Sequence, residues 1–145
     1  MTVAQRPLLI VEDSDEDFDI ALRTLRRQKF GRPVVRSATG DDALDFFYRR
    51  GRHGDAARPA LVVLDLNLPG TDGRDVLARV KADERLRTIP IVVFSTSSNP
   101  RDVEQCYQAG ANTYFTKPVD YERFQELWRE LVTYWFGAAH LANGM

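Results

Sequence analysis

The sequence predicts an α/β domain built on one parallel sheet with helices on both faces. Short apolar runs alternate five times with stretches in which apolar residues recur at helical spacing. This alternation is typical of parallel sheets, because each helix that connects two strands covers a face of the sheet. The chain has 145 residues, the length of a single domain, and it contains no internal repeat and no low-complexity linker.

Composition narrows the class of protein further. Hydrophobic residues make up 43% of the chain and charged residues 28%, as in ordinary globular domains. The 20 basic and 21 acidic side chains leave a net charge of -1, so no overall field attracts the chain to nucleic acid or to anionic lipid. Cys106 is the only cysteine, which excludes an internal disulfide and a multi-thiolate metal site. No apolar run has the length of a membrane span, and residues 1–7 lack the apolar core of a secretory signal, so we expect a cytoplasmic protein.

The first half of the chain is predicted to hold two strands and two helices. In order they are strand 8–11, a helix from Asp15 to a stop at Gly31, strand 33–37 and a helix after Thr39. Ser14 or Asp15 is the expected N-cap of the first helix, and Thr39 with Asp42 three residues later resembles a capping arrangement for the second. Strand 33–37 belongs at an edge, because its proline and arginine fit poorly in a central position. Segment 51–58, rich in glycine and arginine, is predicted as a solvated loop, since no aromatic residues alternate with its arginines as in a nucleic-acid patch.

The second half continues the alternation. In order the elements are strand 60–64, helix 73–83, strand 89–94, helix 99–110, strand 113–115 and a long helix from the cap Asp120 to about Phe136. Asp72 is a plausible cap for the first of these helices, and Asn99 followed by Pro100 is the favoured start of the second. The domain is therefore expected to cover residues 1–136, followed by a tail at 137–145 rich in small residues.

Side chains that can take part in catalysis or metal binding follow four of the predicted strands. Right-handed crossovers leave few strand orders, of which the flavodoxin-like order 2-1-3-4-5 is common, and it makes strand 60–64 central. In such sheets ligands bind beyond the carboxyl ends of the strands, where the chain carries Glu12, Asp13, Asp65, Ser95 and Lys117. Asp65 alone could simply begin a turn. The expected convergence of four separate stretches favours a site instead.

These residue types at one edge fit phosphoryl chemistry with a hard metal ion. Carboxylates a few ångströms apart repel one another unless a cation lies between them. Oxygen ligands without histidine or cysteine suit Mg²⁺ or Mn²⁺ rather than zinc. Such an ion can polarise a phosphoryl group while Lys117 and Ser95 stabilise its remaining oxygens, and an aspartate such as Asp65 can attack phosphorus to form a covalent intermediate.

At this point the sequence resembles the receiver domains of response regulators in two-component signalling. The resemblance spans about Leu8 to Phe136 and rests on Glu12-Asp13, Asp65-Leu66-Asn67-Leu68-Pro69 with Gly73, Ser95-Thr96 and Lys117-Pro118. It implies that Asp65 is the phosphoacceptor and receives its phosphoryl group from a sensor histidine kinase. The resemblance also implies a cis peptide at Lys117-Pro118, which would aim the ammonium at the site, although trans is the default.

The resemblance further assigns roles to individual side chains. Asp13 and Asp65 would ligate Mg²⁺ together with the backbone carbonyl of Asn67, with Glu12 helping directly or through water, Lys117 and Ser95 contacting phosphoryl oxygens, and Tyr114 matching the switch aromatic of the family. Asn67, Thr96 and Ser97 would modulate dephosphorylation.

Three positions depart from the family pattern. Glu12 stands where aspartate is usual, which puts direct metal ligation by that residue in doubt. Ser95 keeps the hydroxyl of the usual threonine without its methyl group, so its χ1 angle is less constrained. Thr96 occupies a position usually held by a smaller residue, beside the line of attack for water. We hypothesise that Thr96→Ala accelerates loss of the phosphoryl group.

More narrowly, the sequence is similar to single-domain regulators paired with bacterial and cyanobacterial phytochromes. The likeness rests on Arg58-Pro59, Asp72-Gly73-Arg74, Ile89-Pro90, Ser95-Thr96-Ser97 and Tyr134-Trp135-Phe136, besides the segment at Asp65. It implies a phytochrome kinase as phosphodonor and a homodimer. In the last helix, Tyr121, Val132 and Phe136 widen the apolar arc to roughly 200°, about twice the usual core-facing stripe. We expect a homodimer on this helix to cover the excess, although the tail folding back is the alternative.

Other features are expected to be structural. Cys106 is a small apolar filler, and His53 and His140 lie in a loop and in the tail, too isolated for metal binding. Asp15, Asp17 and Asp19 are expected to form a solvated start of the first helix.

Two other functions remain possible from the residues. An aspartate-nucleophile phosphatase needs a second acid two residues after the nucleophile, where this chain has Asn67. A flavodoxin-like electron carrier needs a phosphate cradle after the first strand, where this chain is acidic. Turnover of a chromogenic phosphate ester and flavin absorbance are the assays that distinguish them.

Overall fold

The computed structural model describes residues 6–142 and contains the predicted sheet. Five parallel strands lie in the order β2-β1-β3-β4-β5. In chain order the elements are β1 (Leu8–Val11), α1 (Asp15–Arg27), β2 (Val34–Ser37), α2 (Gly40–Tyr48), the 3₁₀ turn η2 (Gly51–His53), β3 (Leu61–Leu64), α3 (Gly73–Ala82), β4 (Ile91–Ser95), α4 (Pro100–Ala109), β5 (Thr113–Thr116), α5 (Tyr121–Val132) and the π-helical turn η3 (Thr133–Ala138). None of the described helices is both long and apolar enough to cross a membrane.

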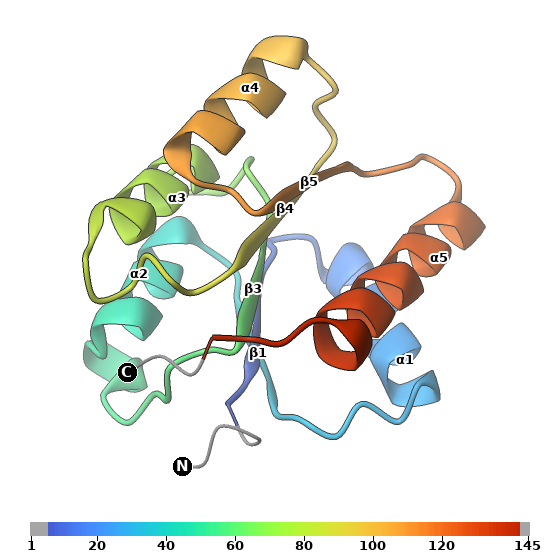
Figure 1. The fold of residues 1–145 in the computed structure, drawn as a ribbon, viewed down its shortest axis with the longest axis horizontal. Coiled ribbons are helices and arrows are strands. Elements are labelled where there is room, and N and C mark those ends of the chain that lie inside the picture. Colours follow the sequence, from blue (N-terminus) through green and yellow to red (C-terminus); the bar gives the residue numbers. More distant parts are fainter. Residues whose placement is uncertain (1–5, 143–145) are drawn as a thin grey trace.

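Helices cover the two faces of the sheet unequally. Figure 1 shows α1 and α5 on one side of the strands and α2, α3 and α4 on the other. Successive residues of a strand point to opposite faces, so Leu9 and Val11 enter the core under the three helices, while Leu8 and Ile10 enter the core under the two. The three central strands are buried on both faces, which explains their continuous apolar sequences.

Helix caps follow the sequence closely. Ser14, Thr39, Asp72, Asn99 and Asp120 each accept a hydrogen bond from a backbone N–H in the first turn of the helix that follows. Each side chain thereby satisfies a donor that the helix itself leaves without a partner. Helix ends are less regular: α1 stops before Gly31, because Lys29 already adopts a left-handed conformation with φ 55°.

The loop after α2 is better ordered than predicted. Its first residues form η2, and the side chain of His53 is buried, with its ring 5.1 Å from that of Phe46. The Nε2 atom of His53 lies 3.1 Å from both carboxylate oxygens of Asp42, which also accepts two hydrogen bonds from Arg52. A carboxylate from α2 thus holds this loop, which the sequence predicts as solvated, against the domain.

Part of the wide apolar arc on the last helix is covered within the chain. Val132 is buried, and the ring of Phe136 packs edge-on against Phe30 at 4.9 Å with the guanidinium of Arg32 5.0 Å from its centre. The segment after α1 thus covers Phe136, which the sequence predicts to lie at the interface with a second chain. Residues 143–145 of the predicted tail lie outside the described residues.

Candidate functional site

The register of the sheet brings the acidic residues together. Val11 at the end of β1 is aligned with Leu64 at the end of β3, so Glu12 and Asp65 leave neighbouring strands at the same level. The Asp65 N–H donates to the carbonyl of Val11 at 3.0 Å, which continues the ladder by one bond. Both acidic side chains are buried, at 6% and 7% residue exposure. The register of β1 and β3 therefore places the two carboxylates at one edge, as predicted.

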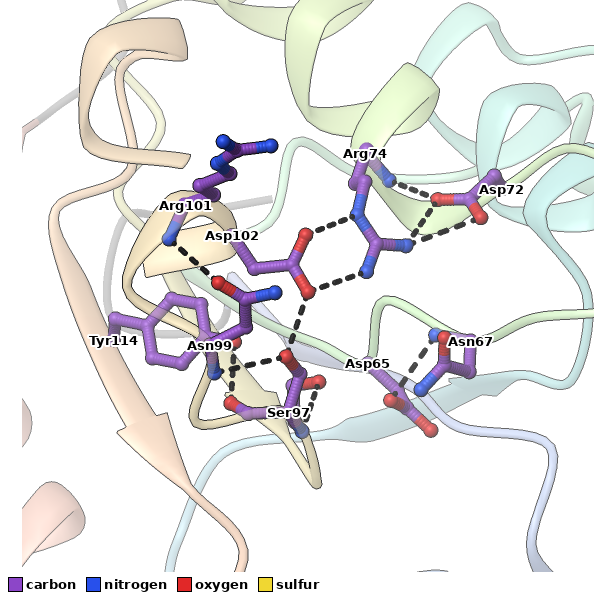
Figure 2. A network of polar contacts seen from close by, with 10 residues as sticks. Asp65, Asn67, Asp72, Arg74, Ser97, Asn99, Arg101, Asp102 and Tyr114 are labelled. Carbon is purple, nitrogen blue, oxygen red and sulfur yellow. Dashed lines mark hydrogen bonds and ion pairs between the residues drawn. The ribbon is translucent and has the colours of Figure 1, made fainter. Parts of the chain in front are cut away.

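The first residue of α3 fixes the backbone that carries Asp65. The Gly73 N–H donates to the carbonyl of Leu66 at 2.8 Å, and a Cβ atom at position 73 would lie 2.2 Å from the carbonyl oxygen of Asp65. Only glycine allows this close approach, since it has no side chain. The side chain is oriented as well, because the N–H of Asn67 donates to Asp65 Oδ1 at 3.3 Å (Figure 2).

Lys117 connects three carboxylates at this edge. Its Nζ atom donates to Glu12 Oε1 at 2.6 Å, Asp17 Oδ2 at 2.9 Å and Asp65 Oδ2 at 3.3 Å. The lysine side chain is only 7% exposed. Its backbone N–H donates to the carbonyl of Ser95 at 2.6 Å, which joins the end of β5 to the end of β4. The predicted approach of the ammonium to Asp65 is present.

The peptide bond that follows Lys117 corrects one expectation. No cis peptide bond occurs among residues 6–142, so the predicted cis form of Lys117-Pro118 was wrong. Trans is the default even before proline, and the flexible lysine side chain reaches all three carboxylates from a trans backbone.

Burial and charge shift the protonation of this cluster. Burial raises the pKa of Glu12 to about 7, with a smaller upward contribution from Asp65, although the ammonium of Lys117 acts in the opposite direction. Burial alone would lower the pKa of Lys117, but its carboxylate partners Glu12, Asp65 and Asp17 raise the pKa above its ordinary value. The lysine therefore keeps its positive charge and acts as the counter-ion of the site.

Three of the carboxylates also form a candidate metal site. Glu12, Asp13 and Asp65 each offer an oxygen, and these oxygens lie within 4.8 Å of one another. The donor set contains only carboxylate oxygens, which fits Mg²⁺ or Mn²⁺. Asp13 is exposed and leaves one side of the group open to solvent, as an ion that keeps several waters requires.

A polar network extends from the end of β4 across to α3 (Figure 2). Ser97 Oγ donates to Asp102 on α4 at 2.6 Å, and Arg74 on α3 donates to the same carboxylate. The Tyr114 hydroxyl donates to the carbonyl of Ser97 at 2.8 Å. Thr96, between the two serines, is exposed. The predicted modulating residues Thr96 and Ser97 thus lie on the loop after β4, and the predicted switch residue Tyr114 bonds to that loop from β5.

Comparison with known proteins identifies the family. The family model described as "Response regulator receiver domain" matches residues 8–129. The chain belongs to this family. This receiver domain is 35% identical over 130 residues to "Probable methanogenesis regulatory protein FilR2" of Methanothrix harundinacea, an alignment that covers 90% of this chain and 83% of the relative. It is 34% identical over 128 residues to "Response regulator Rcp1" of Synechocystis sp., covering 88% and 87% of the two chains.

Solved structures agree with the receiver fold. The Mn(2+)-bound form of response regulator Rcp1 superimposes with a TM-score of 0.91 at 32% identity, covering 94% of this chain and 99% of that one. The phosphorylated cyanobacterial phytochrome response regulator RcpA superimposes with a TM-score of 0.90 at 34% identity, covering 94% and 98%. The resemblance inferred from the motifs is confirmed, including its likeness to phytochrome regulators.

Several polar residues of this receiver domain escaped prediction. Asp17 was expected in a solvated helix start, yet it binds Lys117 from the first turn of α1. No signal in the sequence indicated this contact, because Asp17 and Lys117 are 100 residues apart in the chain. No pattern in the sequence indicated the contact of Arg74 with Asp102, because the two residues are 28 positions apart and lie on different helices.

Proposed function

We propose that this receiver domain accepts a phosphoryl group on Asp65 from a phosphohistidine of a sensor kinase and thereby changes its contacts with other proteins. The observation that supports this most directly is the set of contacts between the Lys117 ammonium, the buried Asp65 carboxylate and Glu12. One cation next to a buried acid that faces an open edge suits a nucleophile that receives an anionic group. A phosphatase and a flavin-dependent electron carrier have no comparable support.

In the proposed reaction an oxygen of Asp65 attacks the phosphorus atom. A P–O bond forms as the P–N bond to the kinase histidine breaks, and the electron pair of that bond stays on the imidazole. Lys117 moves from carboxylate partners to a phosphoryl oxygen, and the Ser95 hydroxyl donates to another. Glu12, Asp13, Asp65 and the backbone carbonyl of Asn67 would hold Mg²⁺, which when bound neutralises charge that develops on the phosphoryl oxygens. By the same resemblance, the domain also assists its own dephosphorylation, with Asn67, Thr96 and Ser97 modulating the rate.

A phosphotransfer assay tests this function. The purified protein is mixed with Mg²⁺ and either acetyl phosphate or a phosphorylated histidine kinase, and the added mass of one phosphoryl group is measured. The wild type is expected to become labelled, and Asp65→Asn is not. Asp75→Asn provides a matched control, because Asp75 is an exposed acid in the first turn of α3. Equal labelling of Asp65→Asn and the wild type would refute the assignment.

We further propose that the phosphodonor is a phytochrome kinase. The similarity to RcpA, described as a cyanobacterial phytochrome response regulator, supports this choice of partner. Purified phosphorylated phytochrome kinases should transfer their label faster than histidine kinases without a photoreceptor, at equal concentrations. The opposite ranking would exclude a light-responsive partner.

A homodimer through the C-terminal helix is the proposed assembly. Tyr121 and Tyr134 remain 42% and 58% exposed, although Val132 and Phe136 are covered within the chain. Beside them, a cavity of about 380 Å³ is lined by Asn112, Thr113, Phe115, Glu130, Leu131, Tyr134 and Trp135. Exposed aromatic residues next to a cavity and the free edge of β5 suit a second copy of the chain. Light scattering should give twice the mass of the chain for the wild type and the mass of one chain for Tyr134→Glu, while a monomeric wild type would contradict this assembly.

We also propose the limits of the domain and its cellular compartment. We assign residues 1–136 to the receiver domain and residues 137–145 to a tail without a role in phosphotransfer. Cys106, the only cysteine, is buried and free, as suits a reducing compartment such as the cytoplasm. No contact with nucleic acid or membrane is part of the proposed function.

A further inference from the structure

The hydroxyl of Ser95 is held by the loop that follows it. Ser95 is fully buried, and its Oγ atom accepts a hydrogen bond from the N–H of Ser97 at 3.2 Å. Within the described residues, the hydroxyl hydrogen of Ser95 has no acceptor. One lone pair is therefore fixed, and the hydrogen stays available for a group that arrives at the site.

Ser97 is in turn fixed by Asp102 on α4, by Asn99 at the cap of that helix and by Tyr114 on β5. Its Oγ atom donates to Asp102 Oδ2 at 2.6 Å and accepts from the N–H of Asn99 at 3.3 Å, and its carbonyl accepts from the Tyr114 hydroxyl at 2.8 Å. A hydroxyl that donates to a carboxylate at this distance forms a strong, charge-assisted bond. Ser97 therefore cannot move without breaking a bond to α4.

Arg74 closes the network on the α3 side. Its Nε and Nη2 atoms lie 3.1 Å from the two carboxylate oxygens of Asp102, the fork geometry typical of strong arginine–carboxylate pairs. Its Nη1 atom bonds Asp72, the cap of the helix whose first residue contacts the backbone of Asp65. Figure 2 shows these side chains as one connected set between Asp72 and Tyr114. The bonds from Arg74 and Ser97 also lower the pKa of Asp102, so this carboxylate stays ionised.

We infer that Arg74 and Asp102 are positioning residues for phosphoryl acceptance, acting through Ser97 to hold the Ser95 hydroxyl where it can donate to a phosphoryl oxygen. This inference rests on the proposed function and extends it to two residues that touch neither the carboxylate cluster nor the incoming group. Loss of either residue leaves Ser95 present but free to rotate, and serine without the methyl group of threonine has no other constraint on χ1. A donor fixed in advance contributes more than one that must be ordered during the reaction.

The test measures two quantities for the full chain with Mg²⁺. They are the rate of phosphorylation by acetyl phosphate and the affinity for beryllofluoride, a non-covalent mimic of the phosphoryl group. Removing a preorganised donor outright slows such reactions roughly 100- to 1,000-fold, so loosening one is expected to reduce both quantities by about 5- to 20-fold. The variants are Arg74→Ala, Asp102→Asn and Ser97→Ala. Ser97→Thr keeps the hydroxyl and should restore both quantities to near the wild-type values.

Matched controls separate positioning from loss of structure. Arg101 is exposed on the same turn of α4 and points away from Asp102 in Figure 2, so Arg101→Ala should change neither quantity. In the double variant Asp102→Asn with Ser97→Ala, the phosphorylation rate and the beryllofluoride affinity should fall no further than in the more impaired of the two single variants. The reason is that the two residues act through one contact. If Asp102→Asn does not fold, the comparison of Ser97→Ala with Ser97→Thr decides the question.

Each outcome has one meaning. The positioning role is overturned if the wild type becomes labelled and neither Arg74→Ala nor Asp102→Asn changes the rate or the affinity. Equal losses in Ser97→Ala and Ser97→Thr overturn it as well. Both outcomes leave phosphoryl acceptance by Asp65 intact. A wild type that neither becomes labelled nor binds beryllofluoride overturns both.

Discussion

Removal of the Asp13 carboxylate is expected to stabilise the metal-free protein. Its carboxylate forms no hydrogen bond or ion pair with any residue between 6 and 142, and it lies within 4.8 Å of carboxylate oxygens of Glu12 and Asp65. Unlike those two acids, Asp13 is not bonded to Lys117. Asp13 therefore adds repulsion that no bonded cation compensates, and Asp13→Asn removes that repulsion while keeping the shape of the side chain.

The size of the effect follows from the distances. At an effective dielectric constant of about 20, two unit charges 4.8 Å apart repel by about 3.5 kcal/mol. Because Asp13 is exposed, solvent and salt reduce this to about 1 kcal/mol or less for each pair. Attraction between the acid and the positive end of α1 offsets about 0.5 kcal/mol. We expect Asp13→Asn to raise the free energy of unfolding by about 1 kcal/mol, which raises Tm by about 3 °C.

Urea unfolding in EDTA and in Mg²⁺ checks both the sign and the cause. In EDTA the variant should be more stable than the wild type. At a Mg²⁺ concentration ten times its dissociation constant, the wild type gains about 1.4 kcal/mol and the variant gains less, so the difference disappears or reverses. Asp55→Asn is the control, because Asp55 is an exposed acid in the loop before β3. A variant that is less stable in EDTA, or that gains as much from Mg²⁺ as the wild type, would show that the cluster is not held under charge repulsion.

Four further outcomes are expected. Gly73→Ala should lower the free energy of unfolding by at least about 2 kcal/mol and abolish labelling of Asp65, because its Cβ would lie 2.2 Å from the carbonyl oxygen of Asp65; a normal unfolding curve would contradict the close approach. Trp128→Ala should lower the free energy of unfolding by about 3–5 kcal/mol in chemical denaturation, whereas Trp128→Phe should lower it clearly less, since the buried indole N–H has no partner among residues 6–142. Burial alone would raise the pKa of Asp42, but hydrogen bonds from its arginine and histidine partners lower it from 3.8 to about 2. The resulting stability is present above pH 4 and lost as the pH falls through about 2, so the wild type and Asp42→Asn should differ at pH 6 and converge near pH 2 in urea titrations. Thr96→Ala should release the phosphoryl group several-fold faster in a dephosphorylation time course, because the exposed Thr96 side chain stands beside Ser95; unchanged kinetics would count against that role.

The predictable part of this protein is the part that depends on order along the chain. Strand and helix periodicity predicted the sheet, and the expected strand order predicted that Glu12 and Asp65 lie at one edge, which the register of β1 and β3 confirms. The caps followed for the same reason, since Ser14 or Asp72 bonds to a residue two or three positions away. Lys117 was placed at the same edge because parallel strands end together.

What could not be predicted depends on contacts between distant segments. His53 lies in a segment with the composition of an ordinary loop, and only the packed structure brings it to Asp42 on α2. Periodicity showed that the arc on the last helix was wide, but it cannot show which segment covers Phe136, and Phe30 does so from the same chain. The pair of Arg74 with Asp102 has the same origin, because charged residues on helix surfaces usually face solvent.

The contacts of Lys117 with three acids have a consequence for folding in the absence of metal. Metal sites made only of like-charged ligands often leave a polypeptide unable to collapse until an ion is delivered. Here the polypeptide brings its own positive charge to the same place, 3.3 Å from Asp65. We therefore expect the domain to reach its native fold without Mg²⁺, because the Lys117 ammonium offsets part of the repulsion among the acids.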